Sequence, residues 1–237
     1  MNEPKDQRGT EGTPKPSPDS PKQARLVLLA LLAVAAATIL GVSYDAPKRA
    51  AKVDTATAAV QRGIAAFDSG HYGIALKELE PIANKGNAQA AYWLGRIYDE
   101  GLGVKRNART AVSWYRKAAE GGLTDAKLQL GELYFKGTEE LQDFKKARKW
   151  LEQAALDGNA RAQLDLARLY ANGWGGGKDP IQAYVWYEFA AKQGDHEAER
   201  LRDGLLKTLR EDQIAEAQRL AEKMASGVIG SQKQGAS

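Results

Sequence analysis

Residues 91–126 read AYWLGRIYDEGLGVKRNARTAVSWYRKAAEGGLTDA, and the two stretches that follow repeat their pattern. Residues 127–162 read KLQLGELYFKGTEELQDFKKARKWLEQAALDGNARA, and residues 163–198 read QLDLARLYANGWGGGKDPIQAYVWYEFAAKQGDHEA. Each stretch is 36 residues long. A shorter, degenerate copy precedes them at 58–90, AAVQRGIAAFDSGHYGIALKELEPIANKGNAQA. A fixed period of this length indicates a repeat array, in which each unit buries its apolar face against its neighbours.

Each unit is predicted to be a pair of helices. In the 91–126 unit, apolar residues recur at helical spacing from about 89 to 100, and Gly101 can end this helix in the left-handed conformation. Gly137 and Gly173 occupy the same position in the next two units. The second helix is expected to begin after a residue that caps its free N–H groups, and these residues are Asn107, Asp143 and Asp179. Small side chains at Ala111, Ala118 and Ala119 would let the two helices approach closely.

The pattern resembles the Sel-one-like repeat family, whose repeats are related to the tetratricopeptide repeat. The resemblance is carried by Leu94-Gly95-x-x-Tyr98 with Gly101, followed by Ala111-x-x-Trp114-Tyr115-x-x-Ala118-Ala119-x-x-Gly122, and it is echoed at 130–158 and 166–194. It implies an all-α fold, a right-handed α-solenoid of antiparallel helix pairs with about four repeats. It also implies work as a scaffold or adaptor, in bacteria often in the cell envelope.

Two further helices are expected to cap the array within residues 199–226. One, Glu199 to about Leu209, and another, Asp212–Ala225, each present apolar residues along one side. Thr208 and Glu211 have the spacing of a capping box at the start of the second helix. A repeat array needs such a polar-backed end to stay soluble. Residues 227–237 are rich in Gly, Ser and Gln and are predicted to form a frayed tail.

The amino-terminal region predicts a membrane anchor. Residues 1–25 are polar and Pro-rich and are expected to be disordered. Leu26 to Tyr44, LVLLALLAVAAATILGVSY, contains nineteen residues without a charge, which is enough for a helix to cross a bilayer. Residues 45–57 follow as a charged, Ala-rich linker. The alternatives are a cleaved signal peptide, against which the long polar region before the run argues, and a buried soluble helix.

Localisation follows from this segment. We expect a single-pass protein of the bacterial inner membrane with its repeats in the periplasm. The alternatives are a secreted or periplasmic form after signal cleavage and an anchored form with cytoplasmic repeats. Flanking charge does not separate them, because Lys15, Lys22 and Arg25 on one side balance three basic residues, Lys48, Arg49 and Lys52, on the other.

Composition argues against most catalytic chemistry. The chain has no cysteine and two histidines, so no thiolate site or histidine-rich metal centre is expected. Its net charge of +4 is spread over the chain, and we expect no nucleic-acid partner. The glycine-rich run at 173–178 lacks the spacing and the Ser or Thr of a phosphate-binding loop. We therefore predict no catalytic residue, no bound metal and no cofactor.

The remaining candidate for function is a surface on the first helix of each unit. There, positions at i, i+3 and i+7 differ between units and are expected to face a common groove if this helix lines the concave side of the solenoid. These residues are Trp93, Arg96, Glu100, Gln129, Glu132, Lys136, Asp165, Arg168 and Asn172. Trp93 suits an aromatic anchor for a peptide, although it can equally pack on the first unit.

The sequence thus predicts a membrane-anchored scaffold or adaptor that binds a protein or peptide partner through this groove and has no catalysis of its own. Two alternatives stay open. One is an envelope glycan- or peptidoglycan-related binding factor or enzyme, and the other is a purely structural spacer. A solvated stripe of charges would look the same in sequence.

Overall fold

The computed structural model describes the backbone of residues 46–137 and 142–234 and the side chains of 55–137 and 142–227. The predicted membrane helix at 26–44 lies outside the described residues. The chain divides into two compact units, Met1–Thr55 and Ala56–Ser237, and all described helices except the start of the first belong to the second unit.

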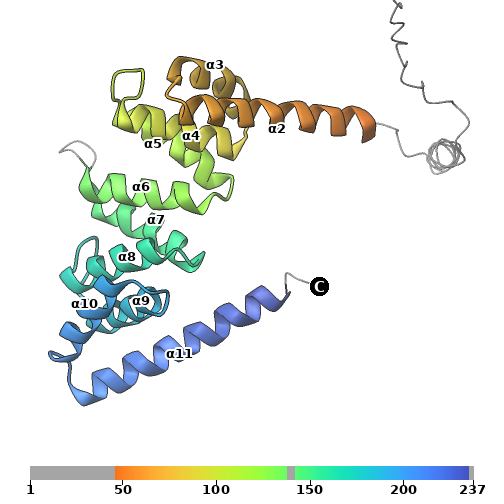
Figure 1. The fold of residues 1–237 in the computed structure, drawn as a ribbon. Coiled ribbons are helices and arrows are strands. Elements are labelled where there is room, and N and C mark those ends of the chain that lie inside the picture. Colours follow the sequence, from red (N-terminus) through yellow and green to blue (C-terminus); the bar gives the residue numbers. More distant parts are fainter. Residues whose placement is uncertain (1–45, 138–141, 235–237) are drawn as a thin grey trace, which may run out of the picture. The chain divides into compact units, whose positions relative to one another are not determined.

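The described residues form ten α-helices and no strand, which confirms the predicted all-helical solenoid (Figure 1). In chain order these helices are α2 (Ala46–Asp68), α3 (Tyr72–Ala83), α4 (Ala88–Glu100), α5 (Ala108–Glu120), α6 (Thr124–Lys136), α7 (Phe144–Leu156), α8 (Ala160–Asn172), α9 (Pro180–Lys192), α10 (His196–Leu206) and α11 (Glu211–Gln234). We call α4, α6 and α8 the A helices and α5, α7 and α9 the B helices. From α3 to α10, each helix packs against the next one in the chain.

The helix starts are fixed by side-chain caps. Asn107, Asp143 and Asp179 each accept a hydrogen bond from the backbone N–H three residues ahead, at 3.0 Å, as predicted for the B helices. The A helices α4 and α8 are capped in the same way by Asn87 and Asn159, which the sequence analysis did not identify. These caps satisfy N–H groups that a helix leaves unpaired at its first turn.

The helix ends depend on glycine in the left-handed conformation at two of the three predicted positions. Gly101 and Gly173 have φ of +73° and +76° and close α4 and α8. Gly137 has φ −40° and ψ 154°, so α6 ends in an extended residue, and the prediction of a left-handed closure there is wrong.

Within each repeat the A and B helices touch through a small residue. A Cβ added to Gly95 would lie 2.5 Å from the Tyr115 ring, and one added to Gly131 would lie 2.5 Å from Leu151 Cγ. Both facing side chains are fully buried. At the equivalent position of the last repeat, Ala167 is itself fully buried. The small residue therefore sets the distance at which the two helices pack.

The two ends of the array differ from the predicted boundaries. α2 begins at Ala46 and runs without a break through the expected linker at 45–57 into the degenerate repeat predicted at 58–90. α10 begins at His196, three residues before the predicted start, because Asp195 accepts hydrogen bonds from the N–H groups of Glu197 and Ala198. α11 continues to Gln234, so the predicted frayed segment is helical from 227 to 234.

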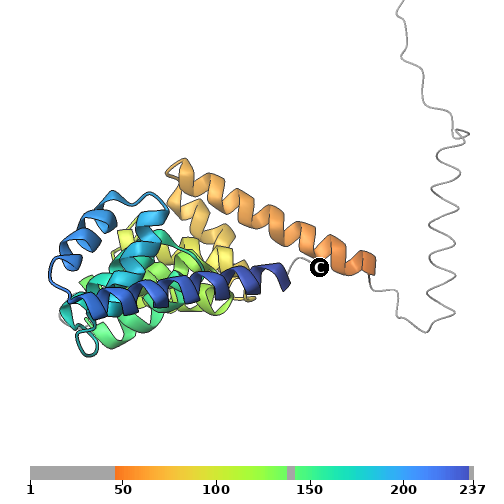
Figure 2. The same ribbon diagram turned by 90° about the horizontal axis from the view of Figure 1, so that it is seen from below.

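α11 also starts differently from its predicted capping box. The side chain of Gln213 accepts a hydrogen bond from Arg210 N–H, whereas the Thr208 hydroxyl donates to Leu205 C=O at the end of α10. The predicted pair of Thr208 and Glu211 is therefore not formed. α11 packs mainly on α9 and is the dark blue helix in Figure 2. There, Ala217 and Ala221 join Tyr184 and Val185 in a small core. Among the helices described, none combines the length and apolar character needed to cross a membrane.

The close approach of α4 and α5 leads to a stability prediction. Gly95→Ala should lower the free energy of unfolding by about 1–3 kcal/mol, because the new methyl group overlaps the Tyr115 ring. The matched control is Gly204→Ala in α10, where a Cβ meets no atom within 4 Å and should stabilise the helix by about 0.5–1 kcal/mol. Chemical denaturation measures both variants. Equal effects of the two changes would contradict the packing role of Gly95.

Candidate partner-binding face

The nine predicted groove residues lie on the three A helices, three on each. Trp93, Arg96 and Glu100 are on α4. Gln129, Glu132 and Lys136 are on α6, and the last three are on α8. The structure does not bring the nine into one site. They fall into an aromatic cluster on α4, a pocket beside α6 and an ion-pair network around α8, and Glu132 belongs to both the pocket and the network.

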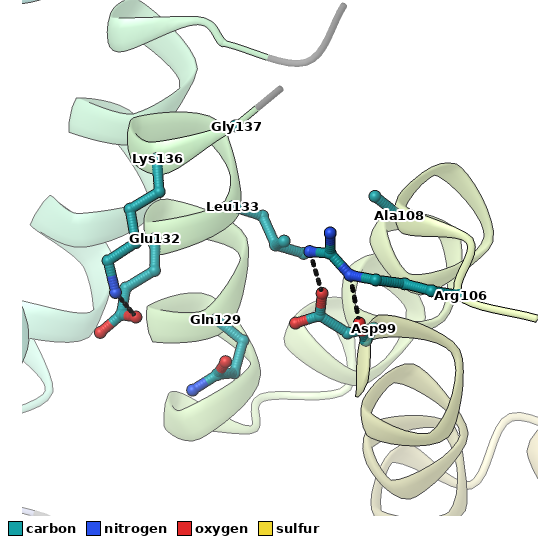
Figure 3. A pocket seen from close by; sticks show the side chains of 8 residues that line it. All are labelled: Asp99, Arg106, Ala108, Gln129, Glu132, Leu133, Lys136 and Gly137. Carbon is teal, nitrogen blue, oxygen red and sulfur yellow. Dashed lines mark hydrogen bonds and ion pairs between the residues drawn. The ribbon is translucent and has the colours of Figure 1, made fainter. Parts of the chain in front are cut away.

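The residues of α6 line an open pocket of about 290 Å³ (Figure 3). The pocket lies between α6 and the end of α4 with the loop that follows it. Its lining residues are Asp99, Arg106, Ala108, Gln129, Glu132, Leu133, Lys136 and Gly137. Figure 3 shows one ion pair on each side of it. Three of the predicted residues thus share a pocket with five that were not predicted.

In both ion pairs the cation is exposed to solvent and the acid is mostly covered. Arg106 donates to the Asp99 backbone carbonyl at 2.7 Å and to its carboxylate at 3.3 Å. Lys136 Nζ donates to Glu132 Oε2 at 2.5 Å. The side chains of the two cations are 58% and 57% exposed, whereas those of the two acids are 18% and 19% exposed. The charges that the pocket presents to solvent are therefore mainly positive.

Trp93 on α4 packs inside the protein instead of standing free. Its ring lies 4.7 Å from the Phe67 ring of α2, centroid to centroid, in an edge-to-face arrangement. The Arg96 guanidinium lies over both rings, 4.8 Å from Phe67 and 5.1 Å from Trp93, and is held by Glu100 at 2.9 Å. Trp93 is half-buried against the main core. Trp93 was predicted either to anchor a peptide or to pack on the degenerate repeat at 58–90, and the structure shows the packing, through Phe67.

Two of the predicted residues on α8, Asp165 and Arg168, belong to a network of ion pairs that joins three helices, whereas Asn172 donates a hydrogen bond to the Arg168 backbone carbonyl. Asp165 is only 2% exposed and is bound by Arg161 at 3.1 Å and Arg168 at 2.8 Å. Arg168 also donates to Glu197 on α10, and Arg161 lies 3.6 Å from Glu132 on α6. Asp165 therefore lies beneath its arginines and presents no free carboxylate to a partner.

The charge of Arg168 is stabilised in this network. Partial burial by itself would lower the pKa of its guanidinium, but hydrogen bonds and charge attraction from Glu197 and Asp165 outweigh burial and raise the pKa. The network therefore favours the charged form of Arg168, which the buried carboxylate of Asp165 needs as a partner.

The sequence contains a signal for these pairs that the groove prediction did not use. Glu132 pairs with Arg161 and Arg168 pairs with Glu197, each 29 positions further along the chain, and the sign of the charges is reversed between the two pairs. This spacing joins the middle of α6 to the start of α8 and the middle of α8 to the start of α10. Asp99 and Arg106 carry no comparable signal, because their contact depends on the course of the loop between them.

No group of three or more His, Asp or Glu side chains among the described residues is placed to hold a metal ion. His71 precedes α3, is exposed and makes no cap hydrogen bond with its side chain.

The position of Trp93 leads to a prediction about its truncation. Trp93→Ala should lower the free energy of unfolding by about 1–3 kcal/mol, less than a fully buried aromatic residue, and should speed amide exchange in α2. Removing the exposed side chain in Leu156→Ala should change stability by less than about 0.5 kcal/mol. Denaturation and hydrogen exchange measure both. If Trp93→Ala left stability and α2 exchange unchanged, Trp93 would be available as a partner anchor.

Comparison with known proteins identifies the repeats. The family model for the Sel1 repeat matches residues 88–123, 124–159 and 160–195. These three matches begin at the first residues of α4, α6 and α8, three residues before the boundaries expected from the sequence. No curated protein matches the chain significantly.

The solved structures similar to this chain include the following three. A Sel1 repeat protein from Oxalobacter formigenes is 36% identical over 59% of this chain and 57% of that one, with a TM-score of 0.55. A protective antigen of uropathogenic Escherichia coli strains, c5321, displays an SLR fold and is 25% identical over 76% of this chain and 47% of that one, with a TM-score of 0.44. The MamA protein is 21% identical over 73% and 95%, with a TM-score of 0.45.

This chain spans 57% and 47% of the lengths of the first two proteins. The family match, the helix boundaries and the similarity to the Oxalobacter formigenes structure agree over the same region. Residues 88–195 therefore form three tandem repeats that match the Sel1 repeat family model.

Proposed function

We propose that this protein is a scaffold or adaptor that binds a protein partner through the A-helix side of its repeats and performs no catalysis itself. The observation that carries the proposal is the pocket beside α6, which is open, polar at its rim and lined by Gln129, Glu132 and Lys136 from the predicted groove. Tandem helical repeats provide extended surfaces of this kind for other proteins.

The other two groups of the predicted groove support the pocket without forming it. Ion pairs link α6 to α8 through Glu132 and Arg161 and link α8 to α10 through Arg168 and Glu197. Trp93 and Arg96 hold α4 against Phe67 of α2. A partner would thus meet a surface whose helices are already fixed, which lowers the entropy cost of binding.

The membrane anchor is the second part of the proposal. Its support is the uncharged run Leu26 to Tyr44, whose nineteen residues suffice to span the hydrocarbon core. We place the protein in the bacterial inner membrane as a single-pass protein, with the repeats in the periplasm. In this arrangement the repeats would bind their partner close to the membrane surface.

A photo-crosslinking residue at Gln129 tests the binding face. With full-length protein in membranes, the crosslinker at this half-buried position should form a discrete adduct of a single partner mass. The matched control is the same crosslinker at Lys149, an exposed position on the B helix α7. Adducts from Lys149 and none from Gln129, measured by gel shift and mass spectrometry, would move the binding face away from the A helices.

Fractionation tests the anchor. Full-length protein should remain with the membrane pellet in high salt and at alkaline pH and should be released by detergent, because burial of about twenty apolar residues is not reversed by salt. Release of intact protein by salt would contradict the anchor.

The side of the membrane on which the repeats lie is tested with an introduced thiol. Since the chain has no cysteine, Lys149→Cys gives a single thiol. Its reaction with a membrane-impermeant reagent in intact spheroplasts is expected for periplasmic repeats, and reaction only after lysis would place them in the cytoplasm.

A further inference from the structure

We propose that the pocket beside α6 is the specificity site of this protein and takes an acidic peptide segment that carries an aliphatic side chain between its carboxylates. The inference rests on the proposed binding function and names the kind of partner. It depends on three observations, which concern the shape of the pocket, its charges and its floor.

One repeat departs from its neighbours in the residues that line the pocket. Residues spaced 36 positions apart occupy the first turn of α3, α5, α7 and α9, and they are Tyr72, Ala108, Phe144 and Pro180. Only Ala108 among these four lines the open pocket. One repeat further along, Phe144 lies 5.8 Å from the Phe135 ring and stacks on Trp174 at 5.6 Å. The side chains of three aromatic residues thus occupy the equivalent junction.

A second substitution contributes to the same opening. Phe135 is the last-turn residue of α6, and the equivalent residue of α4, 36 positions earlier, is Asp99. An aromatic pair at one junction is therefore replaced by aspartate and alanine at the other. On the amino-terminal side, Tyr72 lies 5.5 Å from the Phe67 ring, and a Cβ on Gly103 would come within 2.8 Å of Tyr72 Cβ. Tyr72 and Phe144 both pack against neighbouring side chains, and Ala108 is too small to do so.

The charges select an anionic partner. Arg106 uses two of its five N–H donors and Lys136 one of its three, and both side chains extend into solvent. Asp99 and Glu132 are mostly covered and already paired, Asp99 with Arg106 and Glu132 with Lys136 and Arg161. A carboxylate placed at the rim can accept the remaining hydrogen bonds of Arg106 and Lys136, whereas an ammonium group there would face two cations. Pairs of this kind set association rate and specificity more than total affinity.

The floor adds an apolar contact between the two cations. Leu133 and Ala108 are half-buried and line the pocket. The volume of about 290 Å³ is at the lower limit for a small-molecule site, and it fits one or two side chains of a peptide better than a cofactor. A peptide with an aliphatic residue between two acidic ones would fill both the floor and the rim.

The test uses a fluorescein-labelled peptide in which glutamates flank a central leucine and a matched peptide in which lysines replace the glutamates. Fluorescence anisotropy with the full chain in detergent should show binding of the glutamate peptide at least about tenfold tighter than the lysine peptide, a difference of 1.4 kcal/mol. Ala108→Phe should weaken binding of the glutamate peptide about tenfold, because it fills the pocket as Phe144 fills the next junction. Ala108→Ser, which keeps the pocket open, should bind as the natural chain does.

The charge claim has its own control. Lys136→Gln should weaken binding of the glutamate peptide and reduce its dependence on salt. Lys192→Gln should leave both the binding and its salt dependence unchanged, because Lys192 lies on the B helix α9, away from the pocket. It is a matched control, since Lys192 pairs with Glu188 four residues before it and is 61% exposed. Thermal unfolding of all variants verifies that each is folded. If folded Ala108→Phe bound the glutamate peptide as the natural chain does, the pocket beside α6 would not be the binding site.

Equal binding of the two peptides, equal effects of the two lysine changes, or no binding of either peptide would each overturn the inference. The proposed function would survive any of these results if the crosslinker at Gln129 still captured a partner. Adducts from Lys149 and none from Gln129 would instead remove the proposed function itself.

Discussion

The contact between the A and B helices of each repeat is the constraint on which the rest of the structure depends. Gly95 lets the backbone of α4 meet the Tyr115 ring, and Gly131 lets α6 meet Leu151 in the same way. A glycine in the middle of a helix costs about 0.5–1 kcal/mol relative to alanine, and burial of the facing side chain offsets that cost. Because the contact recurs, successive pairs have closely similar geometry and can stack into one continuous core.

Repetition of the core leaves the junctions between repeats free to differ. The junction that contains Phe135, Phe144 and Trp174 is filled by aromatic rings. The junction before it has Asp99 and Ala108 at the equivalent positions and is open. The two junctions thus differ in side-chain volume at the positions of residues 99 and 108. Variation in surface chemistry can thus accumulate without disturbing the fold.

Charged residues on the A helices serve two different purposes. Around α8, Asp165 is buried and needs two arginines to compensate for the loss of water, so these charges hold helices together. Beside α6 the cations are exposed and each is bound to a recessed acid, so they are available to a partner. Charged residues on neighbouring A helices therefore have a structural role around α8 and exposed cations beside α6.

The sequence by itself determined the helical array, the caps at Asn107, Asp143 and Asp179, and the left-handed ends at Gly101 and Gly173. These features are local or periodic, since a cap bonds to the residue three positions ahead and a repeat copies its neighbour. The sequence also identified the A helices as carriers of variable residues. The start of α10 lies 36 residues after the start of α8, in register with the repeats, and it was missed because the sequence units were placed three residues too late. The length of α11 was missed because this end helix has no repeated copy to define it.

Only the tertiary structure decided which variable residues lie together. It placed Trp93 against Phe67, buried Asp165 beneath two arginines and brought Asp99 and Arg106 beside Gln129, Glu132 and Lys136. Helical periodicity gives the direction of a side chain from its own helix axis, but it does not give the neighbour that the side chain meets. That neighbour depends on how adjacent repeats stack and on the path of the loop after α4, which is set by contacts between residues far apart in the chain.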